Sequence, residues 1–115
     1  IFIEAYNNGT ILSGVSAGAI CWFNYILTNS LNNRLQLSKG LGLINYSCTP
    51  HASSEPERLI MFEQKVKHTL MPPGFAIDDG VAVLFINGKF NKVFSTRPNH
   101  SAYFITESGI KNLEE

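Results

Sequence analysis

The chain has 115 residues, enough for one small domain. Its 44% apolar and 16% charged residues are typical of a globular protein rather than a disordered one. Nine basic and nine acidic residues give a formal net charge of zero with no basic patch, which argues against nucleic acid as a partner. We expect neither a membrane span nor a signal peptide. Cys21 and Cys48 lack metal-ligand spacing, which predicts a reduced, cytoplasmic protein with both as small core side chains.

The first residues have the composition of the end of a helix. Residues 1–6 have no N-cap, and Asn7-Asn8-Gly9 is typical of a helix C-terminus, with Gly9 in the left-handed position. We therefore expect residues 1–115 to be the C-terminal part of a single longer domain whose N-terminal half is missing.

The next segment contains the most informative motif. Residues 10–13 are a short apolar run that predicts a buried strand, and residues 17–27 predict a helix because apolar side chains recur at helical spacing. Between them, Gly14-Val15-Ser16-Ala17-Gly18 forms a Gly-x-Ser-x-Gly pattern. In a sharp strand-to-helix turn, the serine hydroxyl projects at a helix start, where free N–H groups favour negative charge. This context favours a nucleophilic Ser16, with a plain tight turn as the alternative.

The remaining elements alternate along the chain. In order, we expect a polar loop at residues 28–33, a weakly patterned stretch with a short strand at 35–42, a buried strand at 42–48, a helix from about 55 to 70, a short strand at 75–77, a hairpin of strands 81–86 and 89–95 around Asn87-Gly88, and a strand at 102–106. This order predicts an α/β domain with a mainly parallel sheet that ends in antiparallel strands at one edge.

Three residues with complementary chemistry each follow the end of a predicted strand. Ser16, His51 and Asp79 would meet in one crevice, because sites in such sheets form at the carboxyl ends of the parallel strands. A serine hydroxyl needs a base within hydrogen-bond reach, and a carboxylate is the usual group that orients a histidine base. The chain order Ser–His–Asp differs from the Ser–Asp–His order of α/β-hydrolases, which argues against that fold.

Each of these residues has a simpler structural interpretation. A histidine after a proline is often a loop hydrogen-bonder, as His68 and His100 look to be. The segment Asp78-Asp79-Gly80 could be an ordinary turn, since Asx-Gly turns are common. Asp78 also rivals Asp79 as the third member of the set. The agreement of three positions favours the functional interpretation.

The motif Gly14-Val15-Ser16-Ala17-Gly18-Ala19 resembles the nucleophile motif of the S51 peptidases, a family that includes dipeptidase E and cyanophycinase. The resemblance covers most of the chain and continues in Leu41-Gly42-Leu43-Ile44, Cys48-Thr49-Pro50-His51 and Ala76-Ile77-Asp78-Asp79-Gly80. It implies a three-layer, flavodoxin-like α/β fold related to class I glutamine amidotransferases. It also implies a triad with Ser16 as nucleophile, His51 as base and Asp79 as the acidic member, where dipeptidase E has glutamate.

The resemblance also implies how a substrate would be held. In that family a Gly-rich loop upstream of the serine helps to form the oxyanion hole, and this loop would lie in the missing half. Within the chain, the backbone N–H of Ala17 is the candidate oxyanion donor. Dipeptidase E recognises an N-terminal aspartate, so Arg58 is the first candidate to bind a substrate carboxylate, ahead of Arg97 and Arg34. The alternative for Arg58 is a solvated arginine in the first turn of a helix.

The sequence therefore predicts a serine hydrolase of the S51 type that cleaves short peptides, with Asp-X dipeptides as candidate substrates and no metal or organic cofactor. One alternative is a non-peptide amidase or esterase of the same fold, and another is an inert binding module. The expected partners are a peptide substrate and either the missing N-terminal half or a second copy of the chain. We expect the chain to be inactive without that half or to work beside a chain that supplies it.

Overall fold

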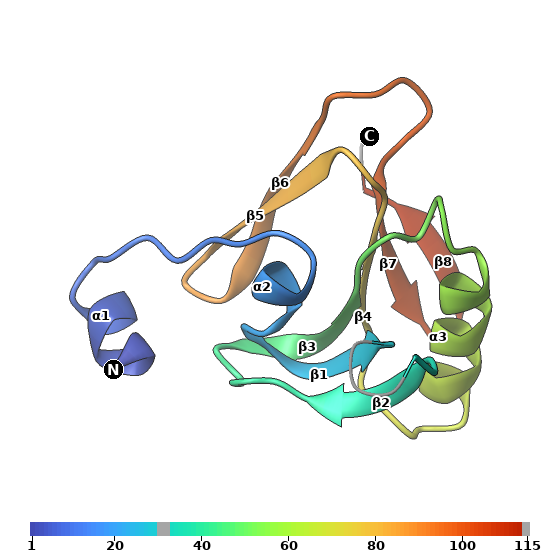
Figure 1. Cartoon of the computed structure of the whole chain (residues 1–115), viewed down its shortest axis with the longest axis horizontal. Coiled ribbons are helices and arrows are strands. Elements are labelled where there is room, and N and C mark those ends of the chain that lie inside the picture. The colour runs from blue at the N-terminus through green and yellow to red at the C-terminus, as the bar shows by residue number, and fades with distance from the viewer. Residues whose placement is uncertain (30–32, 114–115) are drawn as a thin grey trace.

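A computed structural model describes residues 1–29 and 33–113 and is shown in Figure 1. The described chain contains helices α1 (Phe2–Asn7), α2 (Ala17–Ile20) and α3 (Glu57–Lys67) and strands β1 (Phe23–Thr28), β2 (Gln36–Lys39), β3 (Ile44–Thr49), β4 (Gly74–Ile77), β5 (Val81–Ile86), β6 (Lys89–Ser95), β7 (Ala102–Thr106) and β8 (Gly109–Asn112). Part of the polar loop expected at 28–33 lies outside the described residues. None of the helices in the described ranges is long and apolar enough to cross a membrane.

Six strands form the main sheet in the order β2-β1-β3-β4-β7-β8. Strands β1, β3 and β4 are parallel, whereas β2, β7 and β8 pair antiparallel to their neighbours. The expected α/β class is confirmed, but the expectation of a mainly parallel sheet is wrong, because the sheet is mixed. The physical reason lies in the connections: β2 and β8 follow their partners after short loops, which permit only antiparallel pairing.

The predicted hairpin is confirmed at β5 and β6, but it does not extend the edge of the main sheet. It forms a separate two-stranded sheet. In the turn between its strands, Asn87 and Gly88 have φ angles of 54° and 76°. Positive φ at both central residues is what the favoured two-residue hairpin turn requires. The hairpin packs on the main sheet through aromatic rings, with Phe85 and Phe90 centred 5.0 and 5.9 Å from Phe75 of β4.

Two apolar clusters cover the two faces of the sheet. On one face, Phe62 and Val66 of α3 pack against Leu27, Ala76 and Ile105. The cluster on the other face joins α2, the sheet and the hairpin, through Ile20, Phe23, Phe75 and the partly buried rings around them. The sheet therefore lies between α3 on one side and α2 with the hairpin on the other (Figure 1).

The segment around Ser16 differs most from expectation. Residues 10–13 form no strand, and Ile11 is 89% exposed. These residues pair with no strand of either described sheet. The helix expected at 17–27 ends at Ile20, and the run after it forms β1. Because β1 is packed on both faces, its apolar run has no alternating pattern that would distinguish it from a helix.

Candidate active site

Ser16 lies at the turn that leads into α2. Its backbone has a φ of 54° and a ψ of −119°, outside the regions that most residues adopt, as a nucleophile elbow requires. Although Ser16 is the N-cap of α2, its hydroxyl makes no capping hydrogen bond. Instead, Ser16 Oγ lies 3.0 Å from Nε2 of His51. The local fold therefore presents the hydroxyl to the imidazole rather than to the helix.

His51 follows β3 and contacts both of the other predicted site residues. Its Nδ1 lies 2.6 Å from Oδ1 of Asp79. An ionised carboxylate only accepts hydrogen bonds, so His51 carries its proton on Nδ1 and donates it to Asp79. Nε2 is then free to accept the O–H of Ser16. The structure thus brings the three residues from three separate segments into one hydrogen-bonded chain.

Asp78 and Asp79 have separate partners. Asp78 is only 6% exposed, and its Oδ2 accepts the backbone N–H of Ser101 at 2.9 Å and the hydroxyl of Tyr103 at 3.2 Å. These bonds tie the end of β4 to β7. Asp79, and not its rival Asp78, is therefore the aspartate that contacts His51.

The surroundings of Asp79 keep its carboxylate ionised. A hydrogen bond from the Ser54 side chain lowers the pKa of Asp79, and hydrogen bonding and charge from His51, together with the charge of Arg97, lower it further. Such a group stabilises the fold at neutral pH, and this contribution is lost as the pH falls through the lowered pKa. Sequence reasoning missed Ser54, although it lies in the same loop as His51, three residues farther along.

A cavity of about 950 Å³ opens beside these three side chains. Its walls are residues 9–16, the hairpin strand β5 and the segments that follow β3 and β4. A cavity of this size is in the range that holds small ligands. Among the described residues, no group of three or more His, Cys, Asp and Glu side chains gathers to hold a metal ion.

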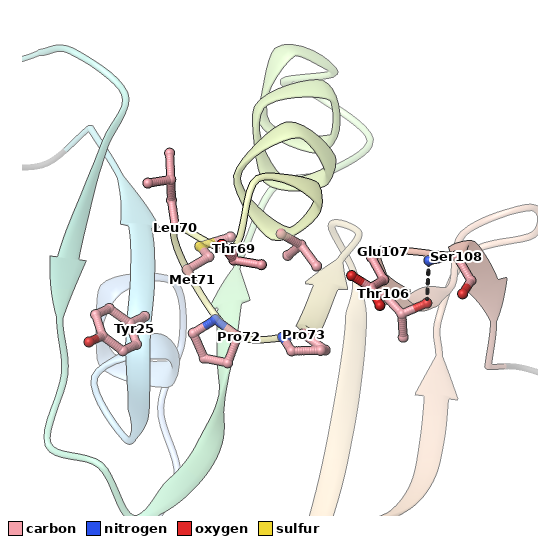
Figure 2. Close-up of a pocket in the computed structure, with 10 residues that line it drawn as sticks. Tyr25, Thr69, Leu70, Met71, Pro72, Pro73, Thr106, Glu107 and Ser108 are labelled. Carbon is pink, nitrogen blue, oxygen red and sulfur yellow. Dashed lines mark hydrogen bonds between the residues drawn. The ribbon is translucent and has the colours of Figure 1, made fainter.

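A second cavity, of about 610 Å³, is shown in Figure 2. It is bounded by the loop after α3, with Leu70 and Pro72, and by the turn between β7 and β8, with Glu107. In that turn Ser108 donates its backbone N–H to Thr106 Oγ1 at 3.1 Å. None of the three hydrogen-bonded site residues lines this cavity, so we place the candidate site in the larger one.

The backbone N–H of Ala17, the predicted oxyanion donor, differs from its neighbours in having no partner among the described residues. Gly18 and Ala19 donate their N–H groups to the carbonyls of Val15 and Ser16 at 2.9 and 3.0 Å. No hydrogen bond from the Ala17 N–H occurs within the described part of the chain. A free N–H directly after the serine is the usual first donor of an oxyanion hole.

The two glycines of the motif have different roles, which a matched pair of variants can test. A Cβ at Gly14 would overlap the carbonyl of Gly18, whereas a Cβ at Gly18 would meet open space. We expect Gly14→Ala to destabilise the fold by about 2 kcal/mol, because the turn must open. Gly18→Ala should cost nothing or stabilise α2 slightly. Urea unfolding of both variants checks this, and equal stabilities would contradict the tight packing at Gly14.

Arg58 does not lie where the sequence predicted. It is 3% exposed, and its guanidinium donates to the Leu27 carbonyl and Thr49 Oγ1, both at 3.0 Å, to Asn29 and to Glu55. Arg58 therefore joins α3 to β1 and β3 and is absent from the lining of the larger cavity, which corrects its expected role in substrate binding.

The other two arginine candidates are exposed. The side chain of Arg97 lies beside Gly80, so that a Cβ added to Gly80 would come within 3.0 Å of Arg97 Nε. The positive charge of Arg97 also lowers the pKa of Asp79. Arg34 precedes the edge strand β2. Neither residue lines the larger cavity.

We expect Arg58→Met to destabilise the protein by about 3 kcal/mol, since it leaves a buried carbonyl and hydroxyl without their charged donor. Arg34→Met, a change at an exposed arginine, should leave stability unchanged. Urea unfolding measures both, and KM for a peptide substrate should be similar in the two variants. A raised KM with a normal unfolding midpoint in Arg58→Met would place Arg58 in substrate binding after all.

Two comparisons relate the chain to known proteins. A model of peptidase family S51 matches residues 1–93, which include the turn at Ser16, His51 and Asp79. The chain is also 38% identical over 103 residues to a protein of Bacillus subtilis (strain 168) named as the uncharacterized peptidase YgaJ. That match covers 90% of this chain but 44% of the relative, so the chain spans less than half of the relative's length. The chain belongs to peptidase family S51.

Proposed function

We propose that this chain carries the catalytic residues of a serine-type peptidase that hydrolyses short peptides. The observation that carries the proposal is the hydrogen-bonded series from Ser16 Oγ to His51 Nε2, at 3.0 Å, and from His51 Nδ1 to Asp79 Oδ1, at 2.6 Å. A serine next to a histidine base whose second nitrogen is held by a carboxylate is the arrangement that nucleophilic catalysis by serine needs. Membership of a peptidase family supports a peptide substrate.

In this mechanism His51 moves the protons. As Ser16 Oγ attacks the substrate carbonyl, its proton passes to His51 Nε2, and Asp79 holds the imidazolium through Nδ1–H. The negative charge on the carbonyl oxygen is stabilised by the N–H of Ala17. When the tetrahedral intermediate collapses, Nε2–H protonates the leaving amine and the C–N bond breaks. A water molecule then gives a proton to Nε2 and attacks the acyl group. As the bond between Ser16 Oγ and the acyl carbon breaks, Nε2–H returns this proton to Oγ and the carboxylic acid product leaves.

We also propose that the chain has the sheet layout of class I glutamine amidotransferases. Three parallel strands, β1, β3 and β4, with His51 and Asp79 just beyond the ends of β3 and β4, support a layout like that of class I glutamine amidotransferases. A second oxyanion donor would come from a Gly-rich loop that precedes this chain in a longer protein, or from a partner copy.

The two free cysteines, Cys21 and Cys48, support a reducing, cytoplasmic location.

The substrate of this site is a short peptide, for which the cavity has room. Its charge preference depends on the nearby cations. Recognition of an acidic first residue needs a cation, and the guanidinium of Arg58 is occupied inside the protein. Arg97 is exposed outside the lining of the cavity, but its charge reaches Asp79, so it is the arginine that would attract the carboxylate of an Asp-X dipeptide toward the site.

Hydrolysis of a matched panel tests the proposal. The panel compares Asp-Leu, Leu-Leu and an aryl ester with the full-length protein that contains this chain, and products are identified by mass spectrometry. Cleavage of a dipeptide that is lost in Ser16→Ala supports the proposed function. Ester cleavage without peptide cleavage would favour a non-peptide hydrolase instead, and no turnover of any substrate would favour an inert binding module.

A further inference from the structure

A tight turn between β6 and β7 places a second histidine beside the candidate site. His100 donates its backbone N–H to the carbonyl of Arg97 at 3.4 Å, which closes a four-residue turn. The central residues are Pro98 and Asn99, and Asn99 has a φ of 63°. Proline followed by a residue with positive φ is typical of a type II turn, so the local sequence specifies this conformation. The turn directs His100 toward the segment that carries Asp79.

Residues 96–101 hold the segment 78–80 along its length. The N–H of Asp78 donates to the carbonyl of Ser101 at 3.0 Å. The carbonyl of Gly80 accepts the N–H and the hydroxyl of Thr96, at 2.9 and 2.8 Å. Between these two anchors, His100 Nδ1 lies 3.0 Å from the carbonyl oxygen of Asp79. The three successive residues of the segment are therefore each tied to the strand connection opposite.

The contact between His100 and Asp79 has a defined direction. A carbonyl oxygen only accepts hydrogen bonds, so Nδ1 of His100 is the donor. On its other side, Asp79 donates its N–H to Ser53 Oγ at 3.2 Å. The peptide group that follows Asp79 leads into Gly80, whose φ of 76° shows a conformation open to glycine and few other residues. Among the described contacts, the bond from His100 is the one that holds the carbonyl of that peptide group.

We propose that His100 is a positioning residue for the proposed hydrolytic reaction. It fixes the backbone of Asp79 so that Oδ1 stays within hydrogen-bond distance of His51, and it acts through Asp79 without touching the substrate. The inference rests on the proposed function. His100 lies beyond residues 1–93 that the family model matches, so the family match assigns it no role.

Replacements that retain or move the donor atom test this role in the full-length protein. In His100→Asn the side-chain amide nitrogen takes about the place of Nδ1, whereas in His100→Gln it takes about the place of Nε2. We expect Asn to keep near-normal kcat and Gln and Ala to lower kcat by about 10- to 100-fold with little change in KM, because small displacements of a catalytic group have effects of this size. His68→Ala, a change at an exposed histidine after α3, is the control.

The rate of labelling of Ser16 by a fluorophosphonate provides a second readout and separates the two levels of the claim. Slower labelling in His100→Gln than in His100→Asn, at equal unfolding midpoints, supports the positioning role. Equal labelling and equal kcat in these two variants would overturn it, even if His100→Ala fails to fold. Absence of labelling in the unchanged protein would instead refute the proposed function and, with it, this inference.

Discussion

Replacing Ser16 by alanine should lower kcat by about 10⁶-fold, the size of loss seen when the nucleophile of a serine triad is removed. The Oγ that would attack the substrate is the atom 3.0 Å from His51. Stability should change little, because this hydroxyl makes no capping bond to α2. Steady-state hydrolysis and urea unfolding of the same preparation measure both effects.

A matched control for this variant is Ser108→Ala, at the exposed turn between β7 and β8 in the wall of the second cavity. It should retain full activity. Normal turnover by Ser16→Ala would show that another group attacks the substrate and would refute the proposed mechanism.

Asp79→Asn should lower kcat by about 10⁴-fold with a small effect on the fold. An amide in place of the carboxylate no longer selects the histidine tautomer with its proton on Nδ1, and it does not stabilise the imidazolium. His51 would then present a protonated Nε2 to Ser16 and could not accept the serine proton. The measurement is kcat per folded molecule as a function of pH. A variant that only loosens the fold would lose stability but keep its kcat.

The variant Asp78→Asn makes the same replacement of a carboxylate by an amide, but at a residue that does not contact His51. Asp78 accepts hydrogen bonds from Ser101 and Tyr103, so this variant should unfold more easily, by about 1–3 kcal/mol. Its loss of kcat should be far smaller than that of Asp79→Asn. The reverse ranking of the two variants would assign the orienting role to Asp78 and contradict the geometry described above.

The meeting of His51 and Asp79 was predictable because both residues follow parallel strands, whereas the strand expected before Ser16 does not form. A residue directly after a parallel strand lies at a known edge of the sheet, so His51 after β3 and Asp79 after β4 were expected to meet. The hairpin turn was equally clear, since Asn87-Gly88 supplies the positive φ angles that the turn requires. Short sequence patterns of this kind specify the local conformation without depending on contacts with distant parts of the chain.

Other features depend on contacts that local patterns do not encode. Arg58 looked like a solvated helix residue, but it binds the carbonyl of Leu27, 31 residues earlier in the chain. Residues 23–28 have an apolar spacing compatible with a helix, yet packing on both faces makes them a strand. The strand expected at 10–13 depended on pairing with a strand elsewhere in the chain, which a short apolar run does not specify, and these residues join neither described sheet.

Covalent labelling with a serine-directed reagent measures whether Ser16 is an activated nucleophile. The full-length protein is treated with a fluorophosphonate, digested and mapped by mass spectrometry. We predict an adduct on Ser16 that forms much more slowly in the His51→Ala variant, since the serine then has no base to accept its proton. An unmodified Ser16, or labelling of Ser16 at the same rate without His51, would show that Ser16 is not a nucleophile activated by His51.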